Sequence, residues 1–309
     1  MRKENQTQVT EFLILGFSNL PHLQLILFNV FLLVYVVTLL GNMMVIIILQ
    51  LKPVLHTPMY FFLRNLSFLE ACFSSVTLPK MLVNLLAEDK TISFRGCATQ
   101  MYFLVFLGTT ECLLLAVMAY DRYVAICYPL RYAILMNQGL CRQLATGCWV
   151  SGILVSLGQT SFIFSLPFCG SNILNHFFCD VPPILKLACG NTFFNEVALF
   201  AVCVFILLIP FLLTLLSYSG IINTVLHMHS AEGRRKAFST CASHLTSVTL
   251  FYGTASFMYL RPKSSYSLDT DRLLALFYSV VTPMLNPIIY TLRNKEVKGA
   301  LIKALTKKN

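Results

Sequence analysis

Four charged side chains lie within or at the end of long apolar segments. Glu70 and Glu111 each interrupt an apolar segment, and Asp121 and Arg122 are adjacent in MAYDRYVAIC, residues 118–127. Charges in hydrocarbon are costly and usually face a bundle interior, where they pair or bind ions. Two buried carboxylates cannot both ionise cheaply unless they share a proton or bind a cation. A guanidinium stays charged, and its acceptors can differ between two helix arrangements. The two acids therefore predict an ion or proton site.

The segments around these charges are long enough to cross a bilayer. Hydrophobic residues make up 57% of the 309-residue chain and charged residues 12%, and the mean hydropathy is +0.72, which is far above that of a soluble domain. A hydrocarbon core about 30 Å thick takes about 20 apolar residues per helix. Seven such segments lie near residues 26–50, 59–86, 98–127, 140–166, 195–226, 237–260 and 272–292. The sequence predicts an all-α, seven-transmembrane helix bundle that forms a single domain over residues 1–309, with the bundle at 26–292.

Basic residues divide unevenly between the two sides of this bundle. Fourteen of the 23 lysines and arginines fall on the side of the C-terminus. Because basic residues concentrate on the cytoplasmic side, residues 1–25 are expected outside the cell and residues 293–309 in the cytoplasm. The net charge of +10 is then a property of an inner face that contacts anionic lipid, and nucleic-acid binding is not expected.

Two features are expected near the chain ends. Asn5-Gln6-Thr7 is a glycosylation acceptor placed outside. The segment RNKEVKGALIKALTKK, from residue 293, alternates an apolar helical face with lysines, which indicates a short amphipathic helix on the inner leaflet. A solvated tail is the alternative.

The third segment carries its charges at defined depths. As a helix, the 25 steps from Cys97 to Arg122 cover about 37 Å, which puts Cys97 at the outer mouth and Arg122 at the inner boundary. Glu111 lies eleven residues before Arg122, on the same helical stripe as Leu104 and Met118. We expect this stripe to face the bundle interior, because an acid facing lipid is costly.

Other membrane functions would need residues that the sequence does not offer. A retinal Schiff base requires a lysine in the last span, and residues 273–292 contain none. His227 and His229 lie near opposite helix faces, and there is no HExxH or GxSxG motif, so an enzyme is not expected. A polytopic small-solute transporter would more often show repeats with paired broken helices, which makes it the weaker alternative. Solute uptake into proteoliposomes would support it.

Six blocks of sequence resemble one receptor family. They are GN at 41–42, LHTPMYFFL at 55–63, MAYDRYVAIC at 118–127, SY at 217–218, KAFSTCASHL at 236–245 and PMLNPIIYTLRNKEV at 283–297. DRY alone is a weak signal, but six blocks in this order and spacing are specific. The chain resembles, over nearly its whole length, a vertebrate odorant receptor of the rhodopsin-like G-protein-coupled family, of the class II branch.

The resemblance implies a signalling function. Arg122, flanked by Asp121, is similar to the family's switch, which is held inward at rest and freed on activation. The implied partner is the stimulatory olfactory G protein, which raises cyclic AMP, and the implied location is the plasma membrane of olfactory cilia. The implied coupling residues are Asp121, Arg122, Tyr123, Tyr218, Lys236, Ser239 and Tyr290.

The resemblance also implies where a ligand binds. The matching positions are Leu104, Val105, Gly108, Thr109, Cys112, Val202, Cys203, Ile206, Tyr252, Ala255, Tyr259 and Ser279. An amine would need a carboxylate at Leu104, and an acid would need a basic residue near Tyr259. Neither is present, and unpaired ionic ligands are costly to bury. A small, neutral, mostly hydrophobic volatile is therefore expected, oriented by one or two hydrogen bonds from Thr109 or Tyr259.

Four cysteines, Cys97, Cys169, Cys179 and Cys189, fall on the predicted outer side, where disulfides are permitted. By themselves they allow three pairings. The resemblance implies Cys97 with Cys179 and Cys169 with Cys189.

The two buried acids gain neighbours from the resemblance. Asn42 and Asn286 occupy the family's matching polar positions, so a sodium or proton site is expected among Asn42, Glu70, Glu111 and Asn286. One neutral, hydrogen-bonded acid is the alternative. No other cofactor is expected.

Overall fold

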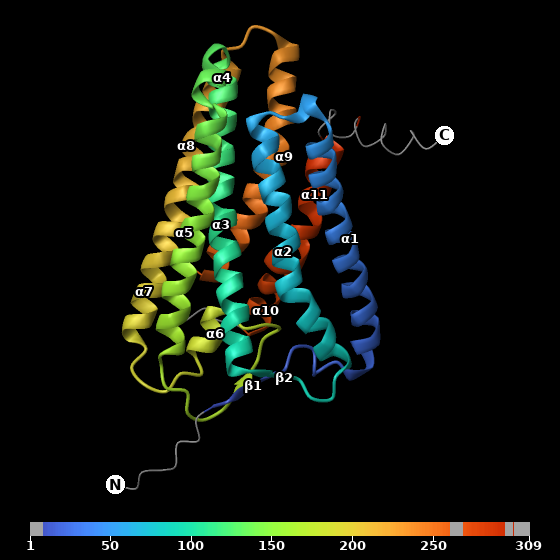
Figure 1. Cartoon of the computed structure of the whole chain (residues 1–309), viewed down its shortest axis with the longest axis vertical. Coiled ribbons are helices and arrows are strands. Elements are labelled where there is room, and N and C mark those ends of the chain that lie inside the picture. Colours follow the sequence, from blue (N-terminus) through green and yellow to red (C-terminus); the bar gives the residue numbers. More distant parts are fainter. Residues whose placement is uncertain (1–8, 260–267, 294–298, 300–309) are drawn as a thin grey trace.

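The computed structural model describes residues 9–259, 268–293 and 299, except for the side chains of residues 236, 239, 240, 268, 269 and 291–293. Asn5 and the amphipathic helix expected after residue 293 lie outside the described residues. Long helices run side by side, and a small sheet lies at one end of the bundle (Figure 1). We call this the sheet end, and the opposite end, where α3 finishes, the Arg122 end.

Seven long helical segments form the bundle, as the sequence predicts. Five are unbroken: α1 (Gln24–Leu51), α2 (Pro58–Leu86), α3 (Phe94–Cys127), α5 (Gln138–Phe164) and α9 (Ala231–Tyr259). Two contain a π-helical turn: α7 (Phe193–Cys203) continues through η4 (Val204–Leu208) into α8 (Ile209–Leu226), and α10 (Leu268–Leu276) continues through η6 (Phe277–Val281) into α11 (Thr282–Arg293). A short turn, η1 (Pro21–Leu23), precedes α1, and other short elements lie between the long segments: η2 (Pro53–Leu55), η3 (Pro129–Arg131), α4 (Tyr132–Leu135) and α6 (Val181–Leu185).

The helices have the lengths that a bilayer requires. Within the described residues, six helical segments are long and apolar enough to cross a membrane. The seventh, α9, is 29 residues long but carries basic residues and several serines and threonines. It begins at Ala231, earlier than the expected residue 237, because the helix continues past the apolar segment.

Local sequence signals explain where two of these helices begin. The Ser93 side chain accepts a hydrogen bond from the Gly96 amide at 3.1 Å and caps α3. The Asn137 side chain accepts one from the Leu140 amide at 2.9 Å and caps α5. Each cap satisfies an amide that would otherwise lack a partner in the first helical turn.

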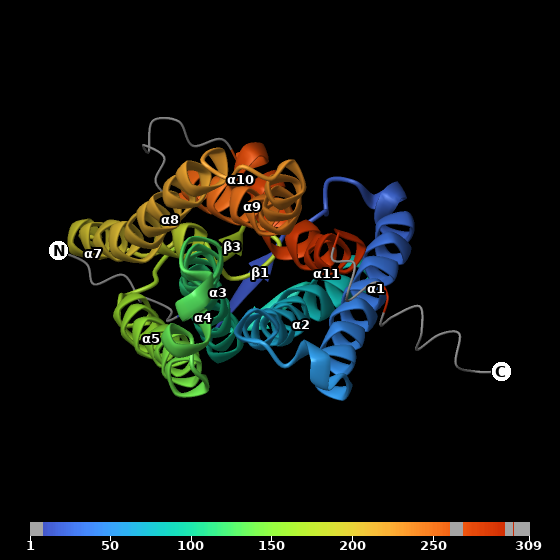
Figure 2. The same cartoon turned by 90° about the horizontal axis from the view of Figure 1, so that it is seen from above.

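α3 lies at the centre of the bundle and packs on α2, α5, α8 and α9, whereas α1 lies at the edge against α2 and α11 (Figure 2). The approach of α5 to α3 requires a glycine. A Cβ atom at Gly152 would lie 2.8 Å from the Phe106 carbonyl oxygen and would also clash with the Thr110 hydroxyl. The glycine therefore lets the two helices pack closely enough to bury the centre of α3.

The three-stranded sheet was not predicted. β1 (Glu11–Ile14) pairs antiparallel with β2 (Thr91–Ser93) and parallel with β3 (Ile173–Leu174), in the order β2-β1-β3. Each strand has four residues or fewer, which is too short for a periodic pattern to be visible in the sequence. Phe12, fully buried, packs edge-on against Phe168 beneath the sheet. The sheet thus joins the first segment of the chain to the loop that precedes α6.

Candidate functional site

A cavity of about 90 Å³ lies between the helices near the sheet end. Nine of the twelve expected ligand residues line it: Leu104, Val105, Gly108, Thr109, Val202, Cys203, Ile206, Ala255 and Tyr259. They come from α3, from the segment formed by α7 and η4, and from α9. The structure therefore brings together most of the positions that the resemblance selects.

Three of the expected ligand residues do not line the cavity. The Cys112 thiol donates to the Ile206 carbonyl at 2.6 Å, and the Tyr252 hydroxyl donates to the Cys112 carbonyl at 2.6 Å. The Ser279 hydroxyl donates to the Ala275 carbonyl at 2.5 Å. Each of these polar groups donates its hydrogen bond to a backbone carbonyl. The three residues therefore stabilise the helix packing and do not face the cavity.

Other lining residues were missed by the sequence analysis: Phe73, Gln159, Val181, Leu199, Leu207, Phe251 and Tyr278. Val181 comes from α6, in the loop between α5 and α7, and Gln159 comes from α5. The sequence feature that could have identified Gln159 is a carboxamide within an apolar span. Nothing in the sequence indicates that α6 turns inward toward the bundle.

A buried carboxylate lies behind the cavity wall at the sheet end. Asp180 is 1% exposed and accepts hydrogen bonds from the Tyr259 hydroxyl at 3.0 Å and the Tyr278 hydroxyl at 2.8 Å. It also accepts one from the Val181 amide at 2.7 Å, which caps α6. The Tyr259 hydroxyl, which is expected to bind a ligand, therefore already donates its hydrogen bond to Asp180. Asp180 ties the loop to α9 and η6 behind the tyrosine rings.

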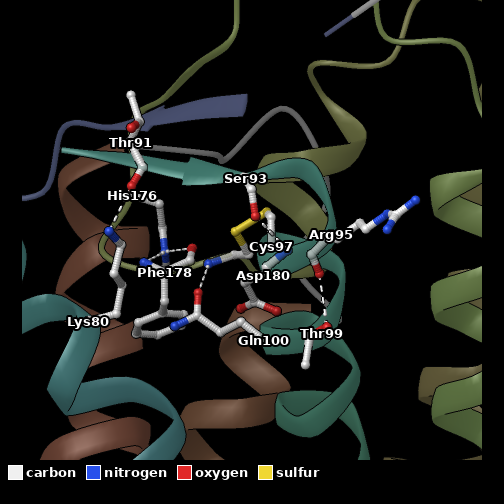
Figure 3. Close-up of a disulfide and its surroundings, with 12 residues drawn as sticks. Lys80, Thr91, Ser93, Arg95, Cys97, Thr99, Gln100, His176, Phe178 and Asp180 are labelled. Carbon is white, nitrogen blue, oxygen red and sulfur yellow. Dashed lines mark hydrogen bonds between the residues drawn. A yellow bond between two sulfur atoms is a disulfide. The ribbon is translucent and has the colours of Figure 1, made fainter. Parts of the chain in front are cut away.

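Two disulfides hold this loop in place, with the pairing that the resemblance implies. Cys97, in the first turn of α3, is bonded to Cys179, next to Asp180 (Figure 3). Cys169 is bonded to Cys189. The Gln100 side chain accepts from the Cys179 amide at 2.9 Å and donates to the Val76 carbonyl of α2 at 3.1 Å. The loop segment around Asp180 is thereby fixed to both α2 and α3.

His176 is buried in the same loop, at 1% exposure. Burial lowers the pKa of His176, Arg272 lowers it further, and Asp180 and Asp271 oppose the shift. The ring is therefore neutral near pH 7. Its Nδ1 atom lies 3.1 Å from the Phe178 carbonyl oxygen, which selects the tautomer that carries the proton on Nδ1.

The two buried acids meet in the middle of the bundle. Glu70 of α2 and Glu111 of α3 are 0% and 3% exposed and lie within hydrogen-bonding range of each other. The Asn286 side chain donates to Glu70 and accepts from the Ser247 hydroxyl at 2.8 Å. Asn42 instead donates to backbone carbonyls of Thr38 and Pro283, at 3.0 and 3.2 Å.

This cluster has oxygen atoms without a partner. Glu70 Oε2, Glu111 Oε1 and Asn42 Oδ1 are buried and form no hydrogen bond with the part of the chain that the structure describes. Within that part, no group of three or more histidine, cysteine or acidic residues could hold a metal ion. The oxygen donors suit a proton or a weakly held hard cation better than a transition metal.

At the other end of the bundle, Arg122 is held by its neighbour. Arg122 Nη2 lies 3.2 Å from Asp121 Oδ2, and Asp121 Oδ1 accepts from the Tyr132 hydroxyl at 2.8 Å. Burial, followed by the Asp121 carboxylate, raises the pKa of Tyr132 in α4 and keeps its hydroxyl protonated. Arg122 is 8% exposed, so its side chain is buried beside Asp121.

A second contact joins three helices about two turns farther along α3 from Arg122. His244 of α9 lies between Tyr218 of α8, whose hydroxyl is 2.7 Å from Nδ1, and the Leu115 carbonyl of α3, which is 3.1 Å from Nε2. Neither the His244 contact nor the Tyr132 contact is predicted by the sequence. The expected coupling residues Tyr218 and Tyr290 are buried and Tyr123 is partly buried, whereas the side chains of Lys236 and Ser239 lie outside the described residues.

Comparison with known proteins places these features in a family. The family profile described as olfactory receptor matches residues 31–308. The chain is 55% identical over 305 residues to Olfactory receptor 10A7 of Homo sapiens, covering 99% of this chain and 96% of that protein. It is 54% identical over 308 residues to Olfactory receptor 10A3 of Homo sapiens, covering 100% and 98%. It is 53% identical over 302 residues to Olfactory receptor 6B9 of Mus musculus, covering 98% and 96%.

Proposed function

This chain belongs to the olfactory receptor family of rhodopsin-like G-protein-coupled receptors, and from that premise we propose that it detects a small, neutral, mostly hydrophobic volatile in the cavity beneath Asp180. It is a multi-pass membrane protein and not an enzyme. The observation that carries the proposal is the lining of the cavity, which is mostly aliphatic and aromatic and includes no charged side chain among the described residues.

Asp180 does not make the cavity a site for cations. Its carboxyl group accepts hydrogen bonds from two tyrosine hydroxyls and one backbone amide, so the protein itself already supplies its partners. A charged amine would have to displace these donors and leave water for an apolar cavity, which is costly. A neutral volatile avoids both costs.

A screen of mixed odorants with a cyclic-AMP readout tests this ligand class. Neutral volatiles are expected to activate the receptor. In a Tyr259→Leu variant, the half-maximal concentration should rise about tenfold, because the Tyr259 ring lines the cavity and a loss of about 1.4 kcal/mol of ligand contact lowers affinity tenfold. Phe257→Leu is the matched control, since Phe257 lies on the same helix but is 53% exposed. Activation solely by charged amines or acids would overturn the ligand class.

We place the Arg122 end in the cytoplasm and the sheet end outside the cell, which agrees with the basic residues and with disulfides at the sheet end. Arg122 and Tyr218 would then contact a stimulatory olfactory G protein, and α9 would move outward on activation. A cleft for a partner helix would open where Arg122 now pairs with Asp121. The expected output is a rise in cyclic AMP, and the expected location is the plasma membrane of olfactory cilia.

The paired acids are proposed to bias the resting state by sharing a proton or binding sodium. Glu111→Gln is expected to remove the dependence of resting activity on sodium and pH, because a neutral amide neither attracts a cation nor shares an acid proton. Glu88→Gln is the control, since Glu88 is exposed near β2. Cyclic AMP would be measured while external sodium and pH are varied. If the resting activity of Glu111→Gln depended on sodium and pH as in the wild type, the site would instead contain one neutral, hydrogen-bonded acid.

A further inference from the structure

The cavity contains two polar groups that the protein leaves unused. Tyr259 and Tyr278 also line the cavity, but their hydroxyls already donate hydrogen bonds to Asp180. By contrast, neither the Gln159 carboxamide nor the Thr109 hydroxyl forms a hydrogen bond with the residues that the structure describes, although both line the cavity. A ligand polar group would therefore find its free partners at Gln159 and Thr109, and not at the tyrosines.

Gln159 occupies an unusual place for a carboxamide. It lies near the sheet end of α5, is partly buried, and shares the cavity wall with Val105 of α3 and with Leu199 and Val202 of α7. These neighbours are aliphatic and supply no hydrogen-bond partner from their side chains. An amide in such surroundings is stabilised when a bound molecule completes its hydrogen bonds.

The donor side of this amide is the part in greater need of a partner. In the protein backbone, buried N–H groups without a partner are rarer than under-satisfied carbonyl oxygens, and a carboxamide carries the same two kinds of group. Gln159 carries two N–H donors, and the Thr109 hydroxyl can donate as well. An uncharged ligand oxygen with two lone pairs, such as a carbonyl oxygen, is the group that matches them.

We propose that Gln159 is a specificity-determining residue of the odorant site, which donates an amide N–H to the carbonyl oxygen of a ketone, aldehyde or ester. This inference rests on the proposed ligand class and refines it. It predicts that the receptor distinguishes a carbonyl compound from a hydrocarbon of the same skeleton through α5, while the other helices supply apolar contacts.

The test compares Gln159→Leu with Thr160→Val, the adjacent residue on α5, whose hydroxyl is buried and does not line the cavity. The probes are straight-chain ketones, the secondary alcohols of the same skeletons and the matching alkenes. In Gln159→Leu, the half-maximal concentration of ketones is expected to rise about three- to tenfold, as for the loss of one neutral hydrogen bond. Alkene responses should not weaken, and Thr160→Val should resemble the wild type.

Two further variants keep the outcome interpretable. Gln159→Met has a similar length without an N–H group, and it repeats the comparison should Gln159→Leu fail to reach the cell surface. Gln159→Glu loses the amide donors but keeps acceptor oxygens. It should therefore weaken the response to ketones and leave the response to alcohols unchanged.

The outcomes separate this inference from the proposed function. Equal losses for ketones and alkenes, or no loss for either, would overturn the role of Gln159 alone. Loss of alcohol responses in Gln159→Leu with unchanged ketone responses would overturn the carbonyl assignment. If the wild-type receptor responded to none of the neutral probes and only to charged compounds, the proposed function itself would be overturned.

Discussion

A Cys97→Ser receptor is expected to be almost absent from the cell surface. The bond to Cys179 fastens the first turn of α3 to the loop that carries Asp180, and both cysteines are fully buried. Loss of a native disulfide typically costs about 2–5 kcal/mol, a large share of the roughly 5–15 kcal/mol that stabilises a folded protein. Staining of an extracellular epitope on intact cells measures the effect.

The second disulfide provides a graded comparison. Cys97 and Cys179 are 82 residues apart, and Cys169 and Cys189 are 20 apart. In the chain-entropy account, the longer loop contributes about 1 kcal/mol more, so Cys169→Ser should retain more surface receptor than Cys97→Ser. Cys72→Ser, which removes a free thiol of α2, is the control and should resemble the wild type. Normal surface levels of Cys97→Ser, or a peptide map that joins Cys97 to Cys169, would contradict the prediction.

Arg122→Ala is expected to abolish most odorant-driven cyclic AMP in receptors that reach the surface. In the resting arrangement the guanidinium is bound to Asp121, and in the active arrangement it must find other acceptors in the opened cleft. A charge-assisted hydrogen bond contributes about 1.5–3 kcal/mol, so losing one from the active state lowers its population about ten- to hundredfold. Cyclic AMP per surface receptor is the measurement.

Two further variants serve as a control and as a test of the opposite effect. Arg142→Ala removes an exposed positive charge at the same end of the bundle and should leave signalling intact. Asp121→Asn weakens the hold on Arg122 and should raise cyclic AMP in the absence of odorant, because the resting pair is destabilised while Arg122 remains. Full signalling by Arg122→Ala at normal surface level would refute the switch.

The ligand cavity shows how far positional resemblance extends. Val105, Thr109 and Cys203 were selected by resemblance and line the cavity, because the helix period fixes which side of a span faces inward. Cys112 and Tyr252 also face inward, but Cys112 bonds to the Ile206 carbonyl of η4 and Tyr252 bonds to the Cys112 carbonyl of α3. Whether an inward residue meets a ligand or another helix depends on how closely two helices approach, and that distance is not encoded in either helix alone.

The seven spans, the inward stripe of α3 and the unequal distribution of basic residues were determined by the sequence, because hydrophobicity, helix period and charge are properties of nearby residues. The sheet, the bonds of Asp180 to the two tyrosines of the cavity wall and the bridge at His244 were decided only by the tertiary structure. Asp180 meets Tyr259 and Tyr278 across separations of 79 and 98 residues, and His244 meets Leu115 across 129. Such contacts form because several packed helices together leave buried donors and acceptors that must satisfy one another, and no local segment carries that requirement by itself.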